Sequence, residues 1–329
     1  MDLNPIDIVI PWVDGNDPEW QQDRDRYCAD EGENRSVIRY RDWGLMPYWF
    51  RAIERFAPWV RTVHLVTWGH LPPWLKVDHP KLHVVFHRDY LPEDALPTFN
   101  SNAIELNMHR IEGLSEQFIY FNDDMFLIKP HQPEDFFQNG MPCDDAILSP
   151  VMPVYGEEIS RISLNNMFVI NKHFPKQETI TAHRSKFLNP KYGKQLLRTL
   201  CLLPWRHFPG FFNDHLPQAF LKSTFETVWQ QENELLSQVT RNRLRDYHHD
   251  VNQWLMRYWQ LCQGKFVPVS PGRGLVYHVS DADVEQTIRN QRTGMVCLND
   301  SDVDDFERLQ KKLEEAFQAI LPEKSTFEI

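Results

Sequence analysis

The first 130 residues alternate between apolar runs of strand length and segments with helical periodicity. The apolar runs span residues 6–12, 62–67, 82–87 and 117–121. Between the first two runs, apolar residues recur every three or four positions from Leu45 to Phe56, which predicts a helix with one buried face. Strands separated by helices predict an α/β fold, with a mostly parallel, Rossmann-like sheet and helices on both of its faces.

The second half of the chain has a looser pattern, in which Pro and Asn are frequent. Helical periodicity returns in three stretches, at residues 216–236, 251–261 and 306–320. We therefore expect an α/β part over residues 1–150 and a helical part over 151–270 that folds back over the sheet. A C-terminal segment over 271–329 should end in an amphipathic helix packed on the body.

Composition and charge narrow the class of protein. With 329 residues, 42% hydrophobic and 25% charged, the chain is typical of a globular protein with a sizeable core. A formal net charge of -11 argues against a nucleic-acid partner, because polyphosphate binding requires a basic field. Five widely spread cysteines without CxxC spacing are typical of reduced thiols in a cytosolic protein. No run of about 18 apolar residues occurs, so we expect no membrane span.

Acidic clusters follow the first and the last of the predicted strands. Asn122, Asp123 and Asp124 come directly after residues 117–121, and adjacent carboxylates at a strand end can hold a divalent cation against a diphosphate. The same residue types also cap helices and form turns, so that alternative stays open. The comparable cluster after the first strand contains Asp14, Gly15 and Asp17. Ligands of parallel sheets bind at the carboxyl ends of strands, which favours one shared site.

Polar residues recur at about one helical turn in the segment between the two clusters. Asn102, Glu105 and His109, followed by Arg110, would share one face of a helix that begins near Ser101. They would then line a binding site, or else form a solvated helix face beside the apolar stripe.

Two candidates for phosphate chemistry lie in the second half. His215 stands at the entrance of a predicted helix, although a lone histidine is more often structural. The basic segment with Arg241, Arg243 and Arg245 could clamp phosphate oxygens, and Asp250 follows it. The alternative for this segment is an exposed connection between helices.

Taken in order, these segments resemble the four blocks of the Stealth family of polysaccharide phosphotransferases. The stretch IDIVIPWVDGNDP, from Ile6 to Pro18, is similar to the first block. The second block resembles the long stretch from Arg39 through LPTFNSNAIELNMHRIEGLSEQFIYFNDDMF, and it is matched over some eighty positions. Residues 214–225 with 241–250 resemble the third block, and 296–300 resemble the fourth.

The resemblance implies transfer of hexose-1-phosphate or N-acetylhexosamine-1-phosphate from a UDP-sugar to a hydroxyl of a glycan acceptor, with release of UMP. It implies a role in capsule or cell-wall polysaccharide synthesis, with Mg²⁺ or Mn²⁺ as cofactor. The acceptor would be lipid-linked, and the enzyme cytoplasmic, with peripheral association at the inner face of the membrane.

The resemblance also implies roles for single residues. Metal and diphosphate binding falls to Asp123 and Asp124, joined by Asp300 or Asp14, phosphate contact to Arg245, and the role of general base to His215. Residues that bind or orient donor and acceptor would be Asp14, Gly15, Asp17, Asn102, Glu105, His109, Arg110, Asn122 and Asp250.

Two alternatives remain open on the sequence alone. A conventional metal-dependent glycosyltransferase would use the same acidic strand end but break the sugar C1–O bond and release UDP. A non-catalytic glycan-binding module would need neither a metal nor turnover.

Overall fold

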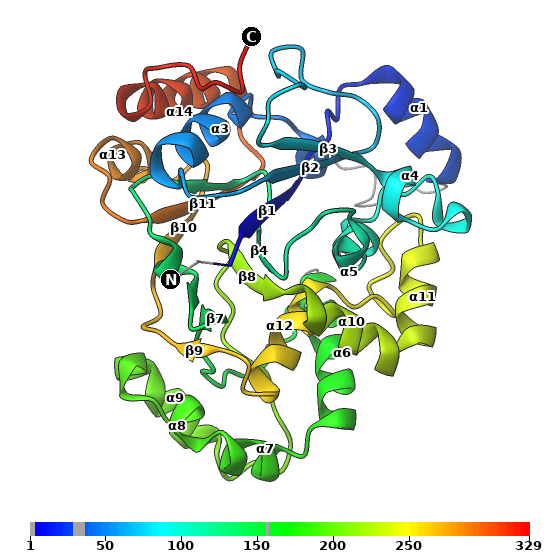
Figure 1. Ribbon diagram of the computed structural model, residues 1–329, viewed down its shortest axis with the longest axis vertical. Coiled ribbons are helices and arrows are strands. Elements are labelled where there is room, and N and C mark those ends of the chain that lie inside the picture. Colours follow the sequence, from blue (N-terminus) through cyan, green and yellow to red (C-terminus); the bar gives the residue numbers. More distant parts are fainter. Residues whose placement is uncertain (1–3, 29–36, 156–157) are drawn as a thin grey trace.

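The computed structural model describes residues 4–28, 37–155 and 158–329. Its centre is a five-stranded sheet with the order β3-β2-β1-β4-β8 (Figure 1). The strands are β1 (Ile6–Pro11), β2 (Val63–Thr67), β3 (Leu82–Phe86), β4 (Gln117–Tyr120) and β8 (Gln218–Leu221). The first four strands run parallel and β8 pairs antiparallel with β4, which confirms the predicted α/β class with a mostly parallel sheet.

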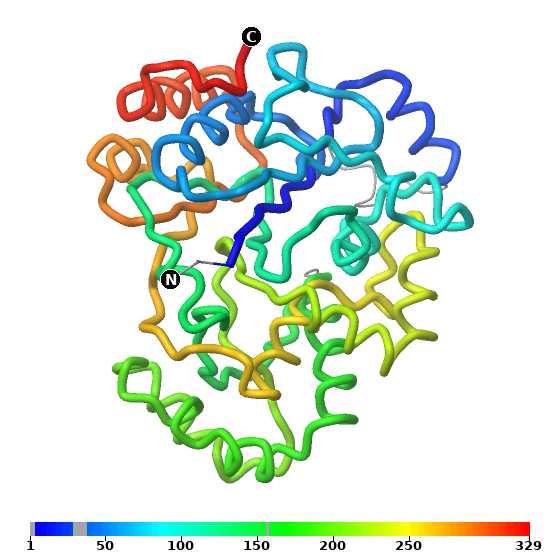
Figure 2. Tube along the Cα trace, viewed as in Figure 1, coloured from blue at the N-terminus to red at the C-terminus, as the bar shows by residue number. Residues whose placement is uncertain are grey.

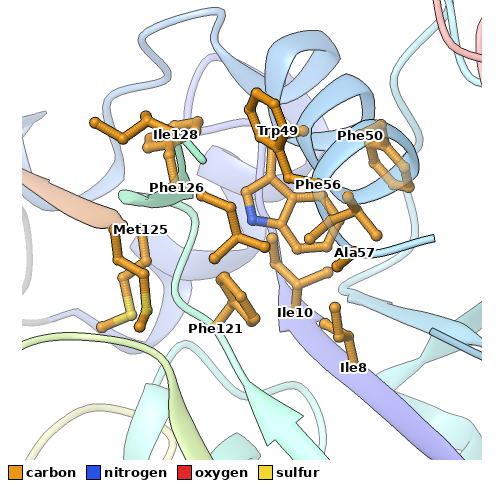
Figure 3. Close-up of a cluster of buried hydrophobic side chains, with 14 of the residues drawn as sticks. Ile8, Ile10, Trp49, Phe50, Phe56, Ala57, Phe121, Met125, Phe126 and Ile128 are labelled. Carbon is orange, nitrogen blue, oxygen red and sulfur yellow. The ribbon is translucent and has the colours of Figure 1, made fainter. Parts of the chain in front are cut away.

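Successive side chains of each strand point to opposite sides of this sheet, and helices cover both sides, so both faces are buried. On one side Ile8 and Ile10 pack against α3 (Met46–Phe56) and α14 (Phe306–Ile320), as Figure 3 shows for the contact with α3. On the other side, the intervening Val9 joins a core built with the helices of the second half. The helices predicted at 45–56 and 306–320 are therefore confirmed, and each buries its apolar stripe.

The second half of the chain is mostly helical, as predicted. Its helices are α6 (Glu158–His173), α7 (Lys176–Ala182), α8 (Arg184–Phe187), α9 (Leu196–Leu202), α10 (Lys222–Gln231), α11 (Asn233–Arg241) and α12 (Gln253–Cys262). The helix predicted for residues 216–236 is wrong at its start, where Gln218–Leu221 forms β8 instead. These four residues of mixed character suit either element, and they form a strand because they pair with the edge of β4.

A smaller sheet brings the C-terminal segment to the centre of the molecule. It has the order β10-β11-β5, in which β11 (Met295–Asn299) is parallel to β10 (Gly274–His278) and antiparallel to β5 (Met125–Leu127). Because β5 follows β4 after one short turn, the end of β11 lies beside that turn, where the Leu298 amide donates to the Asp124 carbonyl.

The remaining α-helices and strands surround these two sheets, and three of the strands form a third sheet in the order β6-β7-β9. They are α1 (Pro18–Tyr27), α2 (Val37–Tyr40), α4 (His87–Tyr90), α5 (Ser101–Leu106), α13 (Val284–Arg289), β6 (Phe137–Gln138), β7 (Met141–Asp144) and β9 (Val267–Pro268). Figure 2 shows the last residues of the chain returning to the region of α3, where Arg51 pairs with Glu328 and Phe50 contacts Phe327. Among the helices described, none combines the length and the hydropathy needed to cross a bilayer.

Candidate active site

A cavity of about 590 Å³ opens at the carboxyl ends of β1 and β4. Its wall is built from the loop after β1, α5, the turn between β4 and β5, the loop before β8 and the start of α12. These elements contribute Trp12, Glu105, Asp123, His215 and Trp254, among others. The cavity therefore joins segments from both halves of the chain at the edge of the sheet where parallel-sheet proteins bind ligands.

The turn after β4 gathers two adjacent carboxylates, and the nearby basic group is the His215 imidazole, whose Nδ1 lies 4.0 Å from Asp124 Oδ2. Asp123 is exposed where it faces the cavity, but many protein atoms lie around it. Burial by this surrounding protein, together with the charge of Asp124, raises the pKa of Asp123 to about 7. Burial also raises the pKa of Asp124, although the nearby His215 opposes this. Asp124 Oδ1 is buried and has no hydrogen-bond partner among the described residues. A divalent cation would supply the missing positive charge, so these residues fit a metal.

Asp300 approaches the same turn from the end of β11. Together with Asp42, Asp123 and Asp124 it lines a second cavity of about 120 Å³ that adjoins the large one. Arg41 Nε donates to Asp300 Oδ2 at 2.8 Å, so the Asp300 carboxylate is already held in an ion pair. The structure thus brings the three predicted metal ligands to one place and adds Asp42 to them.

His215 is held by amides on both ring nitrogens. The Asn122 side-chain amide donates to His215 Nε2 at 3.0 Å, and His215 Nδ1 lies 2.9 Å from Asn299 Oδ1. Nδ1 therefore carries the proton and donates it to Asn299, while Nε2 keeps the lone pair. The expectation of a helix entrance is wrong here, since His215 lies in the loop that leads into β8.

A buried ion pair fixes the loop that carries His215. Arg257 on α12 is only 4% exposed and donates to both carboxylate oxygens of Asp144 at 2.8 and 2.9 Å. The same guanidinium donates at 2.8 Å to the Phe212 carbonyl and to Asn213 Oδ1. These acceptors lie three and two residues before His215. The position of the imidazole therefore depends on the buried pair of Arg257 and Asp144.

Helix α5 places two of its four predicted residues in the cavity wall. Asn102 and Glu105 line it, and burial raises the pKa of Glu105, whereas Arg245 opposes the shift. The expectation that His109 shares their face is wrong, because α5 ends at Leu106. His109 instead packs against Phe225 and Trp229, where burial lowers its pKa to about 3.

Arg110 and Asp250, which were also predicted to bind substrate, make contacts with other protein side chains at opposite ends of α5. Arg110 lies over the ring of Trp229, 4.2 Å from its centroid. Asp250 is fully buried and accepts hydrogen bonds from the side-chain amides of Asn100, Asn102 and Asn242. Asp250 therefore orients Asn102 from behind the cavity.

The three arginines of the basic segment lie in different surroundings. Arg245 lines the cavity, and its Nη2 donates to Ser101 Oγ at 2.6 Å. Arg241 instead pairs with Asp94, and Arg243 donates to the Leu96 carbonyl at 3.0 Å. Of these three arginines, Arg245 is the one placed in the cavity wall; Arg241 is exposed and Arg243 is half-buried away from it.

The acidic cluster after β1 forms a turn and a helix cap. Asp14 Oδ1 accepts from the Asn16 amide and Asp17 Oδ1 accepts from the Trp20 amide, both at 2.9 Å. At Gly15 a Cβ atom would lie 2.0 Å from the Tyr40 carbonyl oxygen, so only glycine fits there. The lining of the large cavity includes residues 11–13 from this part of the chain, but not Asp14, Gly15 or Asp17.

Cys297 and Asn299 are site residues that the sequence analysis did not single out. Cys297 Sγ lies 3.3 Å from His215 Nδ1, and ligand atoms of Asp124, His215 and Cys297 all lie within 4.8 Å of one another. A signal existed in the sequence, because Asn299 and Asp300 follow an apolar run just as Asn122 and Asp123 do. The pairing of β11 with β5 was needed to bring the two together.

Comparison with known proteins identifies the family. Family models described as Stealth protein conserved region 1 and conserved region 2 match residues 4–30 and 39–144. The chain is 40% identical to the capsular polysaccharide phosphotransferase WcwK of Streptococcus pneumoniae, with 99% of this chain and 98% of that protein aligned. The chain belongs to the Stealth family.

Two further relatives align over nearly their whole length. The exopolysaccharide phosphotransferase cps2G of Lactiplantibacillus plantarum is 42% identical over 98% of this chain and 96% of its own. The receptor polysaccharide phosphotransferase WefC of Streptococcus oralis is 38% identical over 99% of this chain and 100% of its own. Conserved region 2 contains Glu105, Asp123 and Asp124, whereas His215, Arg245 and Cys297 come from the part that follows it.

Proposed function

We propose that this Stealth protein transfers hexose-1-phosphate or N-acetylhexosamine-1-phosphate from a UDP-sugar to a hydroxyl of a glycan acceptor, with release of UMP. The relatives named for capsular polysaccharide, exopolysaccharide and receptor polysaccharide phosphotransfer support a role in the synthesis of such polymers. The reaction would take place at the cytoplasmic face of the membrane, on a lipid-linked acceptor.

One observation carries the proposal. A single cavity is lined by the adjacent carboxylates Asp123 and Asp124, a histidine with a fixed lone pair and an arginine, and Asp124 Oδ1 has no hydrogen-bond partner among the described residues; phosphoryl transfer needs groups of these kinds. A glycan-binding module would have no use for a buried carboxylate oxygen without a partner, since an unmatched buried charge costs stability. An enzyme is therefore favoured over a glycan-binding module.

In the proposed reaction, the acceptor hydroxyl oxygen attacks the β-phosphorus of the donor. The bond between this phosphorus and the oxygen that bridges to UMP breaks, UMP leaves with the electron pair, and the sugar C1–O bond survives. The acceptor hydroxyl takes the place of the Asn122 amide at His215 Nε2, which then receives the proton. Asn299 holds the opposite side of the ring and orients it for this transfer.

We propose Asp123 and Asp124 as ligands of Mg²⁺ or Mn²⁺, with Asp300 beside them. Such a metal ion, when bound, neutralises charge on the diphosphate and on the transition state. Asp124 Oδ1 is available for this contact. Arg41 is paired with the Asp300 carboxylate, and both residues line the cavity of about 120 Å³ that Asp124 also lines.

Arg245 is the proposed contact to the transferred phosphate. Its Nη2 is anchored on Ser101, while its Nε is buried and has no partner among the residues that the structure describes. A planar guanidinium with free donors matches a phosphate oxygen pair. Asn102 and Glu105 on the same wall are proposed to orient the sugar hydroxyls.

The fate of the donor's β-phosphorus tests the proposal. A panel of UDP-sugars with ³²P in the β position is incubated with the protein, Mg²⁺ or Mn²⁺ and acceptor glycans. Phosphotransfer places the label in the glycan and releases unlabelled UMP. Label that leaves as UDP would establish the conventional glycosyltransferase instead, and glycan binding without nucleotide release would establish the binding module.

A further inference from the structure

One segment of this acidic protein has a pronounced positive charge. Residues 179–213 contain no Asp or Glu, whereas the chain as a whole has a formal net charge of -11. The six basic residues of the segment are Arg184, Lys186, Lys191, Lys194, Arg198 and Arg206. Such separation of charge along a chain points to an anionic partner for the basic part.

We call residues 184–207 the basic arm; it contains α8 and α9. Figure 1 shows α8 and α9 at the end of the molecule opposite to α14. Buried Lys176 donates to the carbonyls of Leu202 and Trp205 at 2.5 and 2.8 Å, which caps the C-terminal end of α9. On the inner face, Thr199 Oγ1 accepts from the Leu148 amide at 3.0 Å. The arm is therefore fixed to the body.

The outer face of the basic arm combines apolar and basic side chains. Leu197, Leu200 and Trp205 are 64%, 44% and 57% exposed, and the two leucines are three residues apart on α9. Two of the basic side chains contact neutral acceptors: Lys191 donates to the Pro268 carbonyl, and Arg198 donates to Gln195 Oε1. Their positive charge is thus left for an external partner.

We propose that the basic arm docks this protein on an anionic lipid bilayer. Lys and Arg would meet lipid phosphates, while Leu197, Leu200 and Trp205 would enter the boundary between headgroups and acyl chains. The acidic remainder of the protein is repelled by the same surface, so it would orient the molecule with the arm toward the membrane. The chain reaches His215 only eight residues after the arm ends at His207, so docking and catalytic loop are neighbours in sequence.

Vesicle flotation with the purified full-length protein tests this surface without any need for turnover. We expect binding to vesicles that contain phosphatidylglycerol, little binding to vesicles of phosphatidylcholine alone, and weaker binding at high salt. Lys194→Glu with Arg198→Glu should lower the partition coefficient at least ~10-fold, because each basic residue near the surface adds to the attraction. Leu197→Ser should weaken binding as well.

Matched controls come from exposed residues elsewhere. Lys311→Glu with Lys312→Glu on α14 makes the same charge change far from the arm, and Val77→Ser removes another exposed apolar side chain. These controls should bind as the unchanged protein does, with all melting temperatures alike. Equal loss in the controls, or no preference for anionic vesicles, would overturn the proposal. So would self-association that the arm variants abolish, since the arm would then be an interface between copies of this chain.

Discussion

The strands β1 and β4 are parallel neighbours, and each is followed by a cluster of acidic residues, yet the two clusters differ in their contacts. After β1, Asp14 and Asp17 accept hydrogen bonds from backbone amides within their own segment. After β4, Asp123 and Asp124 crowd together with raised pKa values, and Asp124 Oδ1 stays without a partner in the described part of the chain.

The difference lies in the secondary-structure element that comes after each cluster. After β1 the chain enters α1, and the first turn of a helix has free amides that acidic side chains can cap. After β4 the chain enters β5, whose backbone pairs with β11 and leaves few free amides for side chains. Residue type and strand position are therefore not enough to identify a metal site, because the next element decides whether a carboxylate is already satisfied.

The largest expected effect concerns His215, which contacts the β4 cluster through Asn122. Replacement His215→Ala should lower turnover by ~100- to 10,000-fold with little change in donor binding, because a general base acts in the transition state. Single-turnover rates and donor affinity measure the two effects. The melting temperature should stay nearly constant; a loss of activity that follows only the unfolded fraction would make His215 structural.

Exchange of carboxylates tests the comparison directly. Asp123→Asn and Asp124→Asn should each lower turnover by at least ~100-fold, because loss of a metal ligand raises the barrier by several kcal/mol. The matched change Asp14→Asn alters the cluster after β1 and should have a much smaller effect. Excess EDTA should stop the unchanged enzyme, and Mg²⁺ or Mn²⁺ should restore it. Full activity in EDTA would contradict the metal assignment.

Asp7, at the other end of β1, is a carboxylate with complete hydrogen bonding. Burial opposes its charge, but hydrogen bonds from His64, Arg61 and the Ser115 amide prevail and lower its pKa from 3.8 to about 2. The resulting stability of about 2 kcal/mol is complete above pH 4 and is lost as the pH falls toward 2. Urea unfolding between pH 2 and 6 measures this loss, and Asp7→Asn should remove that part of the pH dependence.

The smallest expected effect concerns the acidic cluster after β1, whose carboxylates accept hydrogen bonds from backbone amides. Asp17→Ala removes the N-cap of α1 and should lower the free energy of unfolding by about 1 kcal/mol. Denaturant unfolding measures this change, and Asp17→Asn serves as the control that keeps a cap. If turnover per folded molecule also fell strongly, Asp17 would bind substrate and the two clusters would be more alike than their contacts indicate.

Periodicity and strand-end chemistry predicted much of this molecule. The four parallel strands, α3, α12 and α14 follow from the spacing of apolar residues, and the turn after β4 follows from adjacent carboxylates behind a buried run. Local patterns do not predict β8, because four residues of mixed character take the structure that the edge of β4 requires. The positions of Cys297 and Asn299 depend on the pairing of segments about 170 residues apart, which no local pattern contains.

The return of the C-terminal segment to α3 also affects how the chain is made. One continuous core contains both Ile6 and Phe327, so residues of β1 need cover from residues that are synthesised about 320 positions later. Synthesis at roughly 5–20 residues per second leaves the apolar face of β1 waiting on the order of tens of seconds. Contacts between such distant residues also form slowly after release. A premature stop before α14 would remove Leu313, Phe317 and Phe327 together and leave this core incomplete.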